Sequence, residues 1–373
     1  MLSEQVLSRG TVRALFLLPK IKQERQTIMR ALKDNKSNQP RLNKKRCQSG
    51  MDGMELALTL ENMEHLYLPR EELKNNAGNT IVSMECVHGV VKAYVNAVHG
   101  VRSDNVKPYG CLGELNEIKL GIVEARVTQF MREYLQKHLK DRYSDEMIQA
   151  MAVKSLEVNV TIPCVGGATP SDVIALIDLA LDKTMVFRKR KTQGKYKKVN
   201  TGCLFSKSKE YRVKVYDKSE EQRQKGNLLL EENLLRVEIV FIDRALRRMF
   251  GDKRNVLDML SFQAIETMCR EYKRVLELDI LNGSIKPCLN YCVEQLVESL
   301  VSAETGNEIS ETVTRYKELI PDTEVLRKAL KRWYHIRGEE DKSKQAINYY
   351  RQKGIGLPEG VLQTIRAFHD AAG

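Results

Sequence analysis

Alternation of apolar and polar residues along the chain predicts several β-strands. Strands are expected because successive side chains of an extended chain point to opposite faces, which gives a period of two. His88-Gly89 forms the break between the first two segments. The predicted strands are 80–87, 90–95, 156–162, 211–216 and 234–242.

Helical spacing of apolar residues predicts the elements that alternate with these strands. A long amphipathic helix is expected over 115–139. A second is expected over 169–181, with Thr169 as its cap and Pro170 in the first turn. After Gly251 the chain is predicted to be helical to its end, with breaks near Asn282-Gly283, Gly306-Asn307, Pro321 and Gly354.

The order of these elements indicates an α+β protein with a central antiparallel sheet flanked by helices and an all-helical C-terminal region. We expect three parts: a basic, irregular N-terminal region over 1–75, an α+β domain over 76–250 and a helical region over 251–373. The basic cluster at 41–46 indicates either a solvated arm or an arm that contacts DNA. The helical region is a candidate for DNA binding or oligomerisation.

The net charge of +12 over 373 residues indicates a polyanionic partner. Nucleic acid, an anionic membrane surface and a ribosome-like assembly all qualify. No apolar run approaches the length of a membrane-spanning helix, and the early run 14–18 ends at Pro19, too short for a signal peptide. We therefore expect a cytoplasmic protein with no membrane partner. The eight cysteines lack zinc-site spacing and are expected to be buried thiols.

The strongest concentration of charge lies between Val186 and Lys214, where eleven basic residues accompany one acid, Glu210. Gln193-Gly194 in the middle of this run indicates a long hairpin with a cationic tip, which would neutralise DNA phosphates. The alternative is a solvated charged loop, which self-repulsion among the cations disfavours. With one residue of a later strand, the residues expected to bind DNA are Arg188, Lys189, Arg190, Lys191, Lys195, Lys197, Lys198, Arg212, Lys214 and Arg236.

A candidate reactive group follows directly, because Tyr216 ends a predicted strand and Lys218 lies two residues beyond it. A phenol ionises near pH 10, so a neighbouring base or cation must assist if it is to act as a nucleophile at neutral pH. Lys218 could stabilise a phenolate or the charge of a phosphate. If 211–216 pairs with 234–242, Arg236 and Glu238 join Tyr216 on one polar surface, where Glu238 could hold a divalent metal. An ordinary strand surface is the alternative.

Four motifs occur in a fixed order over 155–356. They are Tyr216-x-Lys218-x-x-Glu221 at a strand end, Arg236-x-Glu238 followed by Arg244 and Leu246, the strand 156–161 leading into the helix 171–181, and the tail Trp333, Gly338, Tyr349-Tyr350-Arg351 and Gly354-Ile355. Their order resembles the gene II-type replication initiators of filamentous phages and the related rolling-circle initiators of plasmids.

This resemblance implies a protein that binds a double-stranded origin and exposes single-stranded DNA. Tyr216 would attack one phosphodiester, giving a 5′-phosphotyrosine and a free 3′-hydroxyl, and the reverse step would rejoin the strand. It also implies Mg²⁺ or Mn²⁺ held by Glu238 and Asn159, and action in a bacterial host cell with the host's helicase and polymerase. Two departures stand out: Asn159 replaces the acid that is common in the family, and no His-hydrophobic-His motif occurs.

A non-enzymatic origin-binding protein or repressor stays open as an alternative, since only the role of Tyr216 would change. An RNA-binding protein is disfavoured by the aromatic content of 6% and by the lack of a stacking-platform motif. The C-terminal helices could pack around Trp333, or could form a helix-turn-helix reader with Lys344, Arg351 and Lys353 near phosphates. The origin sequence and homo-oligomerisation are left open.

Overall fold

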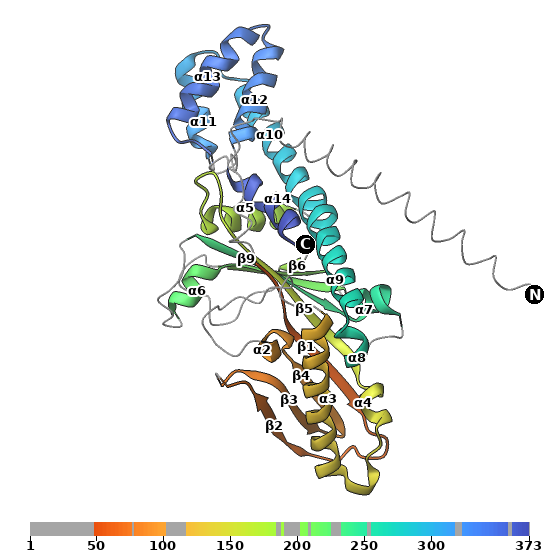
Figure 1. Ribbon diagram of the computed structural model, residues 1–373. Helices are drawn as coiled ribbons and strands as arrows, with labels where there is room; N and C mark the ends of the chain where they lie inside the picture. The colour runs from red at the N-terminus through yellow and green to blue at the C-terminus, as the bar shows by residue number, and fades with distance from the viewer. Residues whose placement is uncertain are drawn as a thin grey trace, which may run out of the picture. The chain divides into compact units, whose positions relative to one another are not determined.

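The computed structural model describes residues 48–76, 78–101, 117–183, 188–189, 202–207, 210–224, 233–251, 255–317, 323–356 and 360–372. Within these residues, nine strands form one antiparallel sheet in the order β2-β3-β4-β1-β5-β9-β8-β7-β6 (Figure 1). The strands are β1 (Gln48–Thr59), β2 (Leu68–Lys74), β3 (Thr80–Val87), β4 (Val90–Val95), β5 (Ala152–Pro163), β6 (Arg188–Lys189), β7 (Gly202–Lys207), β8 (Tyr211–Asp217) and β9 (Leu234–Ile242).

Helices make up most of the remaining described chain, and they dominate after Gly251 as the sequence predicts. Thr169 caps α5 as expected, since its Oγ1 accepts the Asp172 amide at 3.3 Å. The helices are α2 (Ala97–Val101), α3 (Glu117–Leu139), η3 (Lys140–Arg142), α4 (Glu146–Ala150), α5 (Pro170–Lys183), α6 (Lys218–Gln224), α7 (Asp243–Phe250), α8 (Val256–Met259), α9 (Phe262–Arg274), η4 (Val275–Ile285), α10 (Lys286–Leu300), α11 (Gly306–Arg315), α12 (Thr323–Ile336), α13 (Glu340–Gln352) and α14 (Gly360–Ala371).

The α+β class and the predicted strands are confirmed, and β3 and β4 have the predicted bounds. Their turn is a two-residue hairpin in which His88 and Gly89 have φ of 53° and 69°. Positive φ at both positions is typical of the turn that matches the twist of a hairpin. A side chain at Gly89 would also meet the Met63 carbonyl, since an added Cβ would lie 2.3 Å from its oxygen.

The expectation of an irregular region up to residue 75 is wrong for residues 48–74. Two strands lie there, and β1 takes a central place in the sheet between β4 and β5. Its register against β5 shifts between Met51 and Gly53 and again between Glu55 and Leu56. Such bulges break the period of two, so β1 lacks the alternation that marks the other strands.

The two faces of the sheet differ in polarity. The register of β5, β9 and β8 places Val158, Ile239 and Val213 side by side on one face, and all three are buried. Helices pack on this apolar face. Tyr211, which lies on the same face, donates a hydrogen bond to Asp279 of η4. Helices α5 and α14 also contact β8 and β5 (Figure 1). The opposite face carries polar side chains.

The predicted break at Asn282-Gly283 is wrong, because α9, η4 and α10 run on without interruption (Figure 1). The segment η4 is a π-helix, whose wider turns pair residues five apart. Ser284 Oγ donates to the Asp279 carbonyl at 3.0 Å, and a Cβ at Gly283 would lie 2.9 Å from the Leu278 carbonyl oxygen. Glycine therefore serves the wide turn rather than ending the helix.

Core packing accounts for the two adjacent aromatic residues of α12, whereas Tyr349 of α13 is 48% exposed. Trp333 and Tyr334 of α12 are 2% and 7% exposed. Lys344, Arg351 and Lys353 are exposed. None of the helices in the described part of the chain is long and apolar enough to cross a bilayer. Of the cysteines whose side chains the structure describes, Cys86, Cys288 and Cys292 are buried, Cys164 and Cys269 are half-buried, and these five are free thiols.

Replacing Tyr211 with phenylalanine is expected to lower the free energy of unfolding by about 1.5–3 kcal/mol, because a hydrogen bond to a charged acceptor is lost in the interior. Tyr211 is fully buried, and its hydroxyl lies 2.6 Å from Asp279 Oδ2. Urea denaturation checks this value. The matched control is Tyr134→Phe, which removes a bond to the neutral Pro69 carbonyl and should cost about 0.5–1.5 kcal/mol. Equal losses would contradict the role of the Asp279 charge.

The same hydroxyl predicts a pH dependence of stability. Burial, followed by the hydrogen bond to Asp279, raises the pKa of Tyr211 well above its usual value near 10. A folded pKa above the unfolded one gives a contribution that is fully present below about pH 10 and decreases as the pH rises further. Wild type should therefore lose more stability than Tyr211→Phe between about pH 9 and pH 11.

Candidate active site

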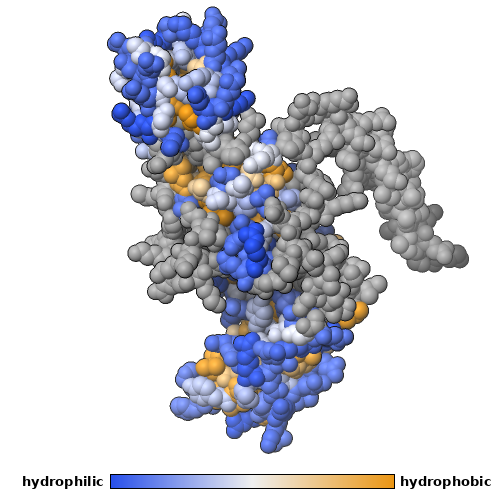
Figure 2. Space-filling view, turned by 90° about the vertical axis from the view of Figure 1, so that its left-hand side faces the viewer, coloured by the Kyte–Doolittle hydropathy of each residue, from blue (hydrophilic) through white to orange (hydrophobic). Residues whose placement is uncertain are grey.

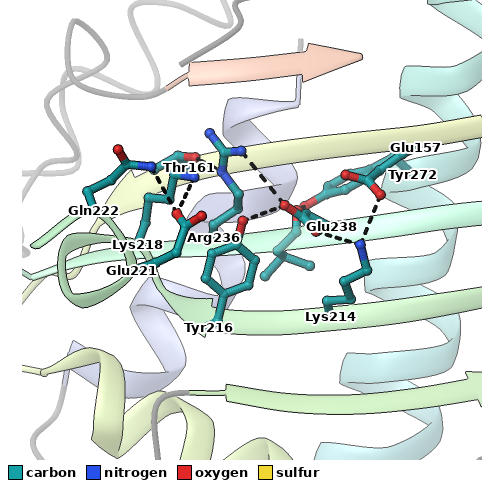
Figure 3. Close-up of polar contacts among 11 residues, drawn as sticks. Glu157, Thr161, Lys214, Tyr216, Lys218, Glu221, Gln222, Arg236, Glu238 and Tyr272 are labelled. Carbon is teal, nitrogen blue, oxygen red and sulfur yellow. Dashed lines mark hydrogen bonds and ion pairs between the residues drawn. The ribbon is translucent and has the colours of Figure 1, made fainter. Parts of the chain in front are cut away.

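The polar face of the sheet brings the predicted reactive residues together from three neighbouring strands. The antiparallel pairing of β8 with β9 is confirmed, and it places Tyr216 opposite Arg236 and Lys214 opposite Glu238. On the other side of β9, Glu238 lies opposite Asn159 of β5. Figure 3 shows the side chains of Tyr216, Lys214 and Glu238 pointing toward one another, with Arg236 beside them.

Tyr216 and Glu238 form the central contact of this site. The phenol hydroxyl donates to Glu238 Oε1 at 2.5 Å (Figure 3). Burial, opposed by Arg236 and reinforced by the charge of Glu238, raises the pKa of Tyr216 far above its usual value. The phenol is therefore neutral at pH 7, and the carboxylate that would accept its proton already touches it. A nucleophile and a base in hydrogen-bond contact are the usual arrangement of an activated hydroxyl.

Lys214 links two carboxylates beside this pair. Its Nζ lies 2.9 Å from Glu157 Oε2 and 3.1 Å from Glu238 Oε2. Burial opposes the charged form, but Glu238 and Glu157 together raise the pKa of Lys214 above its usual value. The Lys214 side chain is 41% exposed, whereas that of Glu238 is 7% exposed. An anion in solution therefore reaches the site first at Lys214.

Glu157 is the residue that the sequence analysis missed. It lies two positions before Asn159 on β5, so both side chains share the polar face. The sequence could have indicated Glu157, because residues two apart on a strand point to the same face and Asn159 was already assigned to the polar face. With Glu157 on the polar face, its carboxylate is available as a second partner of Lys214 besides Glu238.

The structure corrects the expected positions of Lys218 and Arg236. Lys218 is the first residue of α6, not a continuation of the strand, and is 4% exposed. Its Nζ pairs with Glu221 and lies 5.6 Å from the centre of the Tyr216 ring. Arg236 is 3% exposed and donates from Nε to Thr161 Oγ1 at 2.7 Å. Arg236 is thus an internal cation of the site and not a surface contact.

Asn159 provides the test of whether a divalent metal fits here. Its side chain is fully buried, and neither its oxygen nor its nitrogen has a hydrogen-bond partner among the described residues. A buried amide without partners is costly, so its oxygen is suited to a further ligand. Mg²⁺ needs only one or two carboxylates, with water and substrate phosphates completing its shell. Asn159 and Glu238 meet that requirement, although no group of three or more His, Cys, Asp or Glu side chains able to hold a metal occurs in the part of the chain described here.

The structure describes five of the ten predicted DNA-binding residues, one of which is the buried Arg236. Arg188 and Lys189 form β6, which pairs with β7 in an antiparallel hairpin as expected. Arg212 and Lys214 lie on the polar face of β8, and both are half-buried. The other residues of the cationic run, Arg190, Lys191, Lys195, Lys197 and Lys198, lie outside the described residues.

Comparisons with known proteins add a distant structural similarity. No protein-family model matches this chain, and no curated protein sequence matches it. Among solved structures, a rolling circle replication initiator protein from Geobacillus stearothermophilus is similar over 62% of this chain and 84% of its own chain. The two are 10% identical and the TM-score is 0.29. A similarity at this level assigns no activity to this chain.

Proposed function

We propose that this protein cleaves and rejoins one strand of DNA through a covalent link to Tyr216, as the first step of rolling-circle replication. The observation that carries the proposal is the Tyr216–Glu238 hydrogen bond on a sheet face that also holds Lys214 and Arg236, with Lys218 of α6 beside the Tyr216 ring. A phenol, a base and several cations in one place are what transfer of a phosphodiester to a tyrosine requires. The net charge of +12 supports a nucleic-acid substrate.

The reaction balances with the groups in this site. Tyr216 gives its hydroxyl proton to Glu238, and the phenolic oxygen forms a bond to phosphorus. The bond from phosphorus to the 3′-oxygen of the preceding nucleotide breaks, and that oxygen takes up a proton from water to become a free hydroxyl. Glu238 returns the phenol proton to the hydroxide that is left, so no net proton is gained or lost. The product is a 5′-phosphotyrosine. Because one ester replaces another, the reverse reaction can rejoin a strand without an external energy source.

The cations of the site have separate tasks in this proposal. Lys214, the most exposed of them, would hold a non-bridging oxygen of the scissile phosphate. Lys218 lies over the face of the Tyr216 ring, so it would stabilise the negative charge that develops as the phenol loses its proton. Arg236 lies 3.7 Å from Glu238 Oε1 and would hold that carboxylate in place. Burial of Lys218, Arg236 and Glu238 strengthens their interactions.

A divalent ion would be held by Glu238 and Asn159. Mg²⁺ or Mn²⁺, when bound there, supplies charge that polarises a phosphate oxygen. We propose a double-stranded origin and exposed single-stranded DNA as substrates, with the helicase and polymerase supplied by a bacterial host, and a cytoplasmic site of action. The competing function is a non-enzymatic origin-binding protein or repressor.

Mass spectrometry of a protein–DNA adduct tests this function. The full chain is incubated with Mn²⁺ and a random-sequence pool of single-stranded oligonucleotides, and adducts that survive denaturation are digested with protease and nuclease. We expect a peptide that carries a nucleotide on Tyr216. Supercoiled circular DNA that encodes the chain serves as a second substrate and should be nicked. Intact DNA and no adduct with either substrate would leave the non-enzymatic function.

A further inference from the structure

A groove in the C-terminal helical region collects positive charge from four helices. It has a volume of about 450 Å³ and is lined by residues of α10, α12, α13 and α14. The surface of the part formed by α11, α12 and α13 is largely hydrophilic (Figure 2). Five side chains of the lining are basic and one is acidic: Lys286, Arg327, Lys328, Arg351, Arg366 and Glu324.

The single acid does not neutralise the groove. Glu324 accepts a hydrogen bond from Arg327 Nε at 2.6 Å and lies 3.9 Å from Lys328 Nζ, both on its own helix. Among the residues the structure describes, Lys286 and Arg366 form no ion pair. Like charges facing one another across a groove repel, and an anion from outside would relieve that repulsion. The adjoining hollow along η4 shares Lys286 and Arg366 with this groove and adds the carboxylates Glu277 and Asp370, so the excess of positive charge ends there.

The walls of the groove are fixed by the fold. At the start of α14, Thr364 Oγ1 accepts the Val165 amide at 3.0 Å. A Cβ at Gly360 would lie 1.7 Å from the Val165 carbonyl oxygen, so the helix rests directly on the connection from β5 to α5. On the other side, Leu326 and Leu330 of α12 are buried in the core. Because these helices are anchored, no backbone segment has to become ordered when the cations bind a ligand.

We propose that this groove binds the phosphate backbone of DNA, apart from the site at Tyr216. The ligand chemistry follows from the charge, because five guanidinium and ammonium groups along one hollow match a series of phosphates rather than a single small anion. The proposal rests on the proposed function only in taking DNA as the ligand. It needs no catalytic step, and it differs from a helix-turn-helix reader in using residues of α10, α12 and α14.

The test compares two triple variants of the full chain with equal loss of charge. The groove variant is Lys286→Ala/Lys328→Ala/Arg366→Ala, whose three side chains are exposed. The control variant is Arg315→Ala/Arg332→Ala/Lys342→Ala, which removes three exposed cations of α11, α12 and α13 that do not line the groove. Fluorescence anisotropy measures binding of a labelled DNA duplex in EDTA across a range of salt concentrations. Thermal melts confirm that both variants fold.

We expect the groove variant to bind DNA at least about tenfold more weakly at 0.1 M salt and to lower the salt slope by about 2 to 3, since each lost phosphate contact removes about 0.9. The control variant should bind much closer to wild type, because its three cations do not line the groove and therefore contact no phosphate held there. Equal weakening by both variants, or by neither, would overturn the proposal. Adduct formation on a short oligonucleotide at saturating DNA is a separate readout. If wild type forms the adduct, the groove variant should form it too, because the groove substitutions leave the site at Tyr216 unchanged. The binding result decides the groove even if no adduct ever forms.

Discussion

Replacing Tyr216 with phenylalanine is expected to abolish covalent adduct formation with DNA, a loss on the order of 10⁴-fold or more. The ring and its packing stay, so the change removes little besides the oxygen that would bond to phosphorus. The Glu238 carboxylate keeps Lys214 as a partner at 3.1 Å, which should prevent it from becoming an uncompensated buried charge. Denaturing electrophoresis of the labelled oligonucleotide measures the adduct, and anisotropy shows that the variant still binds DNA.

The control for this variant is another tyrosine that loses the same atom. Tyr291 of α10 is 43% exposed, so Tyr291→Phe should leave adduct formation, DNA binding and the melting temperature unchanged. If Tyr216→Phe forms the adduct at the wild-type rate, another side chain is the nucleophile and the proposed mechanism fails. If Tyr216→Phe lowers the melting temperature and DNA binding together with the adduct, the hydroxyl is structural.

Local pattern predicted the parts of the fold that depend on local rules. Strand β9 has the predicted bounds Leu234–Ile242, and β3 and β4 follow from clean alternation around a two-residue turn. Strand β1 escaped because its bulges place residues on faces that a strict period of two does not foresee. The break predicted at Gly283 failed for a related reason, since glycine propensity cannot distinguish the end of a helix from a wide π turn.

The residues of the site could be predicted from the sequence only where the pairing of their strands could be predicted. Alternation placed Lys214 and Tyr216 on one face, and antiparallel pairing of β8 with β9 added Glu238. The register against β5, which brings Glu157 to Lys214, is set by contacts distant in sequence and is not written in either strand. The burial of Lys218 could not be foreseen, because the chain turns into α6 at that residue. Local patterns therefore gave the face of the site, while its electrostatics needed the assembled sheet.

Glu238→Gln is expected to slow adduct formation by about 10²- to 10⁴-fold, the usual loss when a positioned base is removed. The amide keeps the size of the carboxylate but cannot accept the phenol proton, and the raised pKa of Tyr216 makes unassisted ionisation at pH 7 unfavourable. Single-turnover measurements on a preformed DNA complex isolate this step. The variant should regain rate as the pH rises, because hydroxide can then take the proton, whereas wild type should change little.

Glu157→Gln is the matched control, since both carboxylates pair with Lys214 but only Glu238 touches Tyr216. We expect Glu157→Gln to lower the rate of adduct formation by no more than about tenfold, because the change only weakens one ion pair of Lys214. Equal losses in the two variants would mean that Glu238 acts only by placing Lys214. Restoration of Glu238→Gln by Mn²⁺ alone, with no response to pH, would show that the carboxylate serves the metal and not the phenol. If Glu238 accepts the phenol proton, Glu238→Gln must slow adduct formation much more than Glu157→Gln does. Both glutamates pair with Lys214, but only Glu238 reaches the Tyr216 hydroxyl.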